Sequence, residues 1–240
     1  MTGIAVVTGA AGGIGRATVR QLIADGMTVV ALDLDGDAVA GVSTHAYALD
    51  VSNADDVDEV MGRILAEFGR IDVLVNNAGI TGSQEATTAH LTPIDEFDKV
   101  MAVNVRGPFL CSKAVLPSMI DVGGGHIITI ASAAAIVAFP ARFAYTTSKG
   151  AALQLARSIA VDYASYGIRS NAICPGMVET PMTQWRLDQP ELRARMEAQI
   201  PMGRVANPDE IADAVSVLAS GRLGYANGSA IVIDGGWTSL

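Results

Sequence analysis

Residues 4–15 read IAVVTGAAGGIG, and this stretch decides the fold because it contains a strand, a tight turn and the start of a helix. The apolar run IAVV is typical of a strand that is buried on both faces of a parallel sheet. The glycines that follow allow a tight turn, and they let backbone N–H groups approach an anion at the positive end of the helix. A glycine-rich turn alone is weak evidence, but its place between a strand and a helix predicts a site for a nucleotide pyrophosphate.

Short apolar runs alternate with helical patterns along the whole chain. This alternation predicts right-handed βαβ units and an α/β fold, a single Rossmann-type domain over residues 1–240. Its doubly wound parallel sheet should have about seven strands, with helices on both faces. The expected strands are 3–8, 28–33, 45–49, 71–75, 126–131, 168–174 and 230–234, and the expected helices are 14–25, 54–68, 93–119, 144–166 and 208–220.

One long segment, at about residues 175–207, breaks this rhythm. It begins with Pro175-Gly176 and also contains Pro181 and Pro190. Long loops inside a compact domain are usually functional. We expect this segment to be a substrate lid, and the alternative is a plain surface excursion.

The composition excludes several classes of protein. Half of the residues are hydrophobic and 17% are charged, which excludes disorder and fits a covered sheet or a large subunit interface. The net charge of −9 argues against a nucleic-acid surface. Because the two cysteines form no C-x-x-C motif and the three histidines lie far apart, we expect neither a metal site nor a disulfide. The N-terminus does not resemble a signal peptide and no apolar run could span a bilayer, so we expect a cytoplasmic protein without a membrane partner.

Polar residues follow several of the expected strands. Asp33 ends the second strand, where a carboxylate accepts hydrogen bonds from the adenine-ribose hydroxyls and repels a 2′-phosphate. No cation stands at Gly12 or Leu34 to receive that phosphate, so NAD is favoured over NADP. The alternative for Asp33 is a helix N-cap. Asp50-Val51 and the NNAG stretch at 76–79 also follow strands, at the edge of the sheet where open α/β folds bind ligands.

A second group of residues carries acid–base chemistry. Tyr145 and Lys149 are four residues apart in an expected helix and therefore share one face. An ammonium group beside a phenol lowers the pKa of the phenol. Ser132 ends the preceding strand and could bond a substrate oxygen, while Asn104 could interrupt its helix and hold a water behind Lys149. Each residue also has an ordinary structural interpretation, as a core ring, a solvated helix face or a cap.

Taken together, these motifs resemble the short-chain dehydrogenase/reductase family over residues 3–240. The matching elements are TGAAGGIG (8–15), Asp33, Asp50, NNAG (76–79), Asn104, Ser132, the YTTSK stretch (145–149), Pro175-Gly176 and the DGG stretch (234–236). The sequence departs from the family at Ala131, where many members carry a serine, but Ser132 keeps the spacing to Tyr145.

The resemblance implies a function and roles for individual residues. It implies a catalytic tetrad of Asn104, Ser132, Tyr145 and Lys149, with Tyr145 as general acid and base, and a homodimer or homotetramer. It places the cofactor NAD against Gly9, Gly13, Ile14, Gly15, Asp33, Asp50, Val51, Asn77, Ala78, Gly79, Tyr145, Lys149, Pro175, Gly176, Val178 and Thr180. The expected reaction is hydride transfer between NAD and a small alcohol or ketone.

Arg142 and Arg186 bear on the substrate, because guanidinium groups bind phosphate, sulfonate or carboxylate through paired hydrogen bonds. Surface ion pairs are the alternative. The stretches 96–107, 142–151 and 179–193 are similar to those of a family member that oxidises a secondary alcohol with a sulfonate tail. That resemblance implies that Arg142 and Arg186, with Ser132 and Tyr145, bind an anionic substrate. A broad-range secondary-alcohol dehydrogenase, a 3-oxoacyl reductase and a non-catalytic NAD-binding scaffold are the alternatives.

Overall fold

The computed structural model describes residues 3–83 and 87–239. One parallel sheet of seven strands, in the order β3-β2-β1-β4-β5-β6-β7, runs through the molecule. The Rossmann-type α/β fold expected from the sequence is therefore confirmed. The strands are β1 (Ile4–Thr8), β2 (Thr28–Asp33), β3 (His45–Ala48), β4 (Val73–Asn76), β5 (Gly125–Ile130), β6 (Ile168–Pro175) and β7 (Ala230–Ile233).

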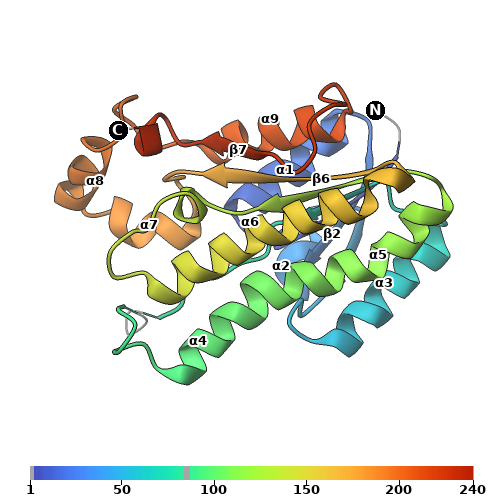
Figure 1. Cartoon of the computed structure of the whole chain (residues 1–240), viewed down its shortest axis with the longest axis horizontal. Helices are drawn as coiled ribbons and strands as arrows, with labels where there is room; N and C mark the ends of the chain where they lie inside the picture. Colours follow the sequence, from blue (N-terminus) through green and yellow to red (C-terminus); the bar gives the residue numbers. More distant parts are fainter. Residues whose placement is uncertain (1–2, 84–86, 240) are drawn as a thin grey trace.

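Helices cover both faces of the sheet (Figure 1). On one face, α1 (Gly13–Ala24) packs against α9 (Pro208–Ala219). The other face carries α3 (Ala54–Phe68), α5 (Gly107–Asp121) and α6 (Phe143–Tyr163). No helix in the described ranges combines the length and the apolar character that a membrane crossing needs.

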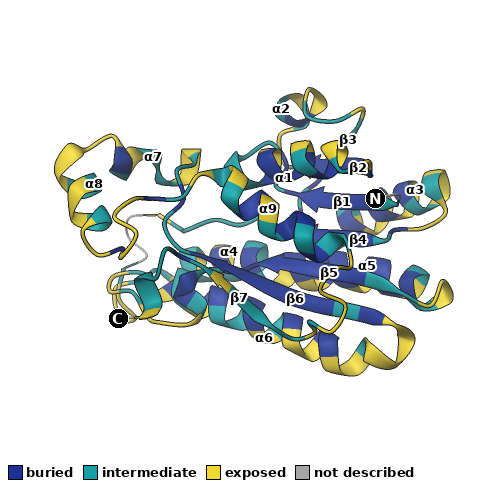
Figure 2. Cartoon of the chain, turned by 90° about the horizontal axis from the view of Figure 1, so that it is seen from above, coloured by how far each residue is buried: buried dark blue, intermediate teal, exposed yellow. Residues whose placement is uncertain are grey.

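The strand pattern explains the two layers. Successive side chains of a strand point to opposite faces, so Val6 packs into the core beneath α3 and α5, while Ala5 and Val7 pack beneath α1 and α9. All three side chains are fully buried. Burying a valine side chain such as Val6 or Val7 contributes about 1.5–3 kcal/mol. Figure 2 shows the consequence, central strands that are buried between the helices, while the edge strands β3 and β7 contain only intermediate and exposed residues.

The strand order positions the functional residues. Along the chain β1 is followed by β2 and β3 on one side, and β4 then pairs with β1 on the other. The point where the strand order reverses is where open α/β sheets bind ligands, outside the carboxyl ends of the strands. Thr8, Asp33 and Asn76 are the last residues of β1, β2 and β4, so all three lie at this edge.

Three elements differ from the sequence prediction. The single helix expected at 93–119 is α4 (Ile94–Met101), a π-helical turn (Ala102–Arg106) and then α5. The long segment after β6 is not an open loop, because it contains α7 (Pro181–Leu187) and α8 (Pro190–Glu197). A short helix, α2 (Gly36–Ala40), follows β2 where only a loop was expected. Prolines at the first positions of α7 and α8 begin these helices, since Pro is well tolerated there.

Candidate active site

The glycine-rich turn after β1 is held in a tight conformation. Gly9 has φ of +64°, which favours glycine, and a Cβ on Gly15 would lie 2.0 Å from the carbonyl oxygen of Gly9. The Asn77 side-chain amide donates hydrogen bonds to the carbonyl oxygens of Thr8 and Gly9, both at 2.9 Å. The Thr8 hydroxyl accepts from the N–H groups of Asn77 and Ala78, both at 3.1 Å. These bonds join the ends of β1 and β4. The N-cap of α1, Gly12, has no side chain to cap the first N–H groups of that helix.

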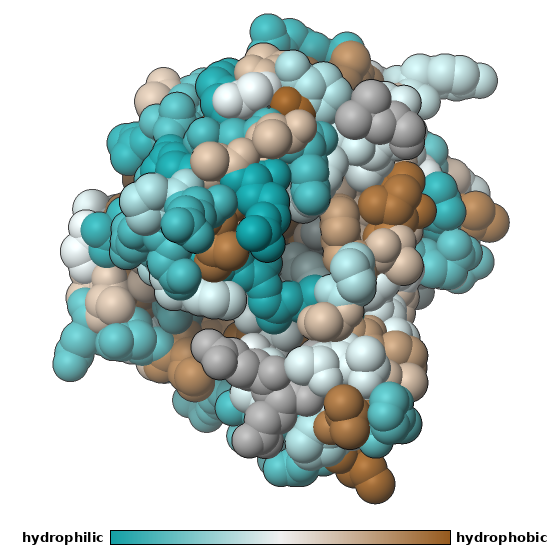
Figure 3. Space-filling view, turned by 90° about the vertical axis from the view of Figure 1, so that its left-hand side faces the viewer, coloured by the Kyte–Doolittle hydropathy of each residue, from teal (hydrophilic) through white to brown (hydrophobic). Residues whose placement is uncertain are grey.

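A groove of about 600 Å³ lies along this edge. All of the residues expected to contact the cofactor line it: Gly9, Gly13, Ile14, Gly15, Asp33, Asp50, Val51, Asn77, Ala78, Gly79, Tyr145, Lys149, Pro175, Gly176, Val178 and Thr180. Figure 3 looks onto this end of the molecule, where the surface is hollowed between a mostly hydrophilic wall and a more hydrophobic one.

Asp33 fixes one end of the groove. Its carboxylate accepts hydrogen bonds from the N–H groups of Ala11, at 2.9 Å, and Asp35, at 3.3 Å. A carboxylate has lone pairs for further donors, so Asp33 can also accept bonds from ribose hydroxyls. The alternative that Asp33 caps a helix is wrong, because Asp35 is the N-cap of α2 and accepts from the Ala38 N–H at 3.0 Å.

The predicted proton-transfer residues lie together at the other end. Tyr145 and Lys149 are in the first turns of α6, and Ser132 follows β5. Lys149 is buried, its Nζ donates a hydrogen bond to the Ile130 carbonyl oxygen at 2.9 Å, and it lies 5.7 Å from the centroid of the Tyr145 ring. Burial lowers the pKa of Lys149 to about 8, because removal from water disfavours its charged form.

The environment of the phenol shifts its pKa in two opposite directions. Burial raises the pKa of Tyr145 above its usual value, and two groups oppose this effect: a hydrogen bond with Ser132 and the positive charge of Arg142. The sequence interpretation gave a pKa-lowering role to Lys149, whose Nζ lies 5.7 Å from the centroid of the Tyr145 ring, and that role stays a prediction.

Asn104 stands behind the groove and does not line it. The predicted interruption of its helix is confirmed as the π-helical turn. The buried Asn104 amide accepts from the Ile80 N–H and donates to the Ile80 carbonyl oxygen, both at 2.8 Å. It also donates to the Ser148 hydroxyl at 2.9 Å, which in turn donates to the Tyr145 carbonyl oxygen at 2.7 Å. Asn104 thus connects the segment after β4 directly to α6. The water that we expect it to hold behind Lys149 stays a prediction.

A second cavity, of about 290 Å³, adjoins the groove. Ser132 and Tyr145 line both spaces. Arg142 and Arg186 also line the second cavity, so the structure brings together the four residues expected to bind substrate. The Arg186 guanidinium carbon lies 4.7 Å from the Trp185 ring centroid, in a cation–π contact.

Several lining residues were missed by sequence reasoning. Phe139 and Trp237 form one wall of the second cavity, with ring centroids 4.6 Å apart, although almost a hundred residues separate them. Met196 and Gln199 come from α8 and the residues just after it. No local motif marks these residues, because only the fold brings them to the cavity. Ser148 had a local signal, since it lies within the YTTSK stretch beside Lys149.

Within the described ranges, no group of three or more His, Cys, Asp or Glu side chains is arranged to hold a metal ion. The polar groups of the groove are suited to a ligand with hydroxyl and phosphate groups. Asp33 offers a hydrogen-bond acceptor at one end, and the start of α1 offers N–H donors beside it.

Comparisons with known proteins agree with this geometry. The family model described as enoyl-(acyl carrier protein) reductase matches residues 9–238. The 2-(R)-hydroxypropyl-CoM dehydrogenase of Xanthobacter autotrophicus is 53% identical over 250 residues, which cover 100% of both chains. The 3-oxoacyl-acyl-carrier-protein reductase of Thermotoga maritima is 35% identical, over 97% of this chain and 96% of the relative. A crystal structure of 3-ketoacyl-(acyl-carrier-protein) reductase from Brucella melitensis, complexed with NADH, is 31% identical with a TM-score of 0.90 over 98% of each chain. The chain therefore belongs to the short-chain dehydrogenase/reductase family of oxidoreductases.

Proposed function

We propose that this chain is an NAD-dependent oxidoreductase that interconverts a secondary alcohol and a ketone, with Tyr145 as its proton-transfer group. One observation carries the proposal: Ser132 and Tyr145 line both the long groove and the second cavity. A cofactor in the groove and a substrate in the cavity would therefore meet at the phenol.

The groove fits NAD. The start of α1 provides N–H groups for the pyrophosphate, and the Asp33 carboxylate accepts hydrogen bonds from ribose hydroxyls and repels a 2′-phosphate. Among the described residues that line the groove, the only cation is Lys149, at the opposite end from Asp33. The Brucella relative was solved with NADH.

The roles of the side chains follow from their positions. Bound NAD supplies the hydride acceptor, or the hydride donor in the reverse direction. Tyr145 accepts the alcohol proton as a phenolate and returns it in ketone reduction. Ser132 bonds the reacting oxygen and stabilises its developing negative charge. As the family resemblance implies, Lys149 would bond the nicotinamide ribose, and the Val178 backbone and Thr180 would hold the carboxamide. Asn104 keeps α6 in register with the segment after β4 through Ser148.

The second cavity favours an anionic substrate. Among its lining residues that the structure describes, the charged side chains are Arg142 and Arg186, and none is acidic. Aromatic and methionine side chains provide the remaining walls. We propose a small hydroxyalkyl sulfonate such as 2-hydroxypropyl-coenzyme M, which agrees with the name of the 53% identical relative. A 3-oxoacyl reductase or a broad-range secondary-alcohol dehydrogenase is the alternative, and the Thermotoga relative supports the former.

The first test replaces Tyr145 by Phe, which removes the hydroxyl and keeps the ring. We expect kcat to fall about 10²- to 10⁴-fold, the usual contribution of a general acid–base group. NADH should still bind, as measured by its fluorescence, because the other groove residues are unchanged. A Tyr145→Phe enzyme with the wild-type rate would disprove the assignment.

The second test compares substrates in Arg186→Gln. We expect KM for 2-hydroxypropyl-coenzyme M to rise about 10- to 100-fold, because a charge-assisted hydrogen bond is lost. KM for 2-butanol should change less than about twofold. Arg195→Gln is the matched control, since Arg195 is an exposed lid residue outside the cavity lining. Equal effects on both substrates would contradict a sulfonate-binding role and favour the alternative functions.

A further inference from the structure

Arg142 and Tyr145 are neighbours at the start of one helix. Arg142 is the N-cap of α6 and Tyr145 is the third residue of that helix, so they are three residues apart. Both line the second cavity, and Arg142 is only partly exposed. A cation and a phenol that share one confined cavity interact more strongly than they would in bulk water.

Other groups near Tyr145 are placed differently. Lys149 faces it from α6 but donates its hydrogen bond to the Ile130 carbonyl oxygen. Ser132, after β5, bonds the phenol but carries no charge. Arg186 reaches the cavity from α7, where it stacks on Trp185. Cys174 of β6 is a buried thiol behind Ser132 and Lys149. Of the two charged residues in the described lining of the cavity, Arg142 is the N-cap of the helix that contains Tyr145, and Arg186 belongs to α7.

We propose that the positive charge of Arg142 stabilises the phenolate form of Tyr145 through the cavity that both residues line. This stabilisation is lost when an anionic substrate tail binds to Arg142. The inference deepens the proposed function and rests on it for the role of Tyr145. Arg142 would thus bind the substrate tail and also act electrostatically on the Tyr145 phenol.

The electrostatics give the direction of the effect. The Arg142 charge lowers the pKa of Tyr145, against the larger effect of burial. Burial lowers the pKa of Arg142, and the charge of a Tyr145 phenolate opposes that effect. A sulfonate that pairs with Arg142 cancels its field at the phenol, so the pKa of Tyr145 should rise when the tail binds. The bound phenolate is then the stronger base. By linkage, the anion should bind more tightly to enzyme that carries the phenol proton.

The test titrates Tyr145 directly in the whole chain. Tyrosinate absorbance is recorded against pH for the wild type and for Tyr145→Phe, and the difference isolates Tyr145. The same difference is taken between Arg142→Gln and the double variant Arg142→Gln/Tyr145→Phe. We expect Arg142→Gln to move the midpoint up by about half to one pH unit, because the pair is partly exposed and partly screened. Arg142→Lys should keep most of the wild-type value, and it guards against a folding defect in the glutamine variant.

The second arm adds saturating 1-propanesulfonate, which has the tail but no reacting hydroxyl. The midpoint should rise in the wild type and stay unchanged in Arg142→Gln. An identical midpoint in the wild type and Arg142→Gln would overturn the inference. So would a ligand-free Arg186→Gln variant whose midpoint lies as far above the wild-type value as that of Arg142→Gln. Because this readout needs no turnover, its failure is separate from failure of the proposed function, which would show as no NAD-linked oxidation of any secondary alcohol.

Discussion

At the scale of single residues, the glycine-rich turn offers a sharp contrast between two neighbouring glycines. A Cβ on Gly15 would lie 2.0 Å from the Gly9 carbonyl oxygen and 2.7 Å from the Asn77 amide nitrogen. A Cβ on Gly12 would meet only the Gly9 carbonyl oxygen, at 3.7 Å, and Gly12 has an ordinary extended backbone. The two positions therefore differ in available space, although both belong to the same motif.

We expect Gly15→Ala to weaken NADH binding at least about tenfold, because the turn must open to accept the methyl group. Overpacking of this kind also costs roughly 1–3 kcal/mol of unfolding free energy. Gly12→Ala is the control and should change the NADH dissociation constant by less than about threefold. NADH fluorescence titration and thermal unfolding measure the two effects. Similar losses in both variants would show that the turn tolerates no side chain at all, and the argument from close contact would be wrong.

At the scale of elements, the sequence predicted the sheet well because its strands carry strong local patterns. Runs such as IAVV and IITI are short and rich in β-branched residues, which favours buried strands, and each lies in the predicted place. The glycine turn and Asp33 were found for the same reason, since strand ends gather at one edge of a parallel sheet.

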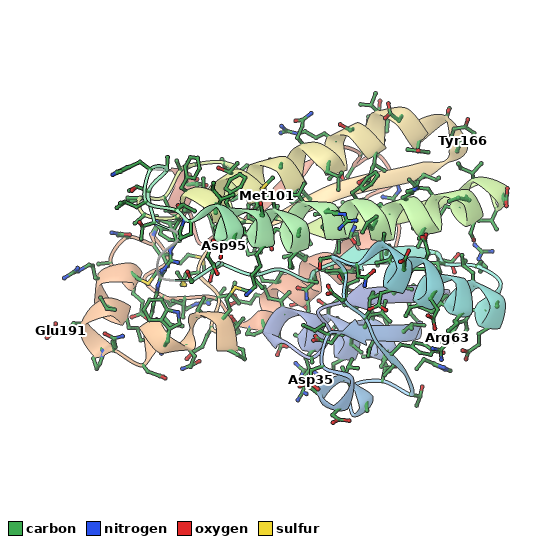
Figure 4. The ribbon with its side chains drawn as sticks, turned by 90° about the horizontal axis from the view of Figure 1, so that it is seen from below. Asp35, Arg63, Asp95, Met101, Tyr166 and Glu191 are labelled. Carbon is green, nitrogen blue, oxygen red and sulfur yellow. The ribbon has the colours of Figure 1, made fainter. Side chains whose placement is uncertain are left out.

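Two elements could not be predicted in detail. Asn104 indicated an interruption, but apolar periodicity over 93–119 is too coarse to show that it is a π-helical turn at Ala102–Arg106, which adds a residue to one helical turn. Figure 4 labels Met101, the last residue of α4, and the helix continues past it into α5 without a sharp bend. The helices α7 and α8 are short. Because α8 buries none of its residues, its sequence has no apolar stripe from which the helix could be predicted.

The lid also shows how polar contacts replace an apolar stripe. Arg193 of α8 forms hydrogen bonds with both carboxylate oxygens of Glu179, at 3.2 and 3.1 Å, which ties α8 to the segment after β6. Glu191, at the outer end of α8, points away from the body of the molecule (Figure 4). Met196, on the same helix, lines the second cavity. An element with few buried contacts opens more easily than the core, which would suit the role of substrate lid that we propose for this segment.

At the scale of the whole molecule, a buried histidine joins the sheet to α9. His126 of β5 bonds the Leu218 carbonyl oxygen through Nδ1, at 3.0 Å, and the Asn171 side-chain amide nitrogen through Nε2, at 2.9 Å. A carbonyl only accepts and an amide nitrogen only donates, so Nδ1 carries the proton and the ring is neutral. Burial, with the charge of Arg169, lowers the pKa of His126 to about 4.

This arrangement predicts an acid-sensitive fold. The unfolded chain binds a proton at His126 near pH 6.5, whereas the folded chain does so only near pH 4. Stability from this group is therefore fully present above pH 6.5, and it is lost as the pH falls towards 4, by up to about 3 kcal/mol. Urea unfolding between pH 7 and 4.5 measures the slope. His126→Gln should be less stable at pH 7 yet have a flatter profile, while His90→Gln, at an exposed position, should keep the wild-type slope. If His126→Gln lost stability on acidification as steeply as the wild type, the acid sensitivity would have to come from the carboxylates instead.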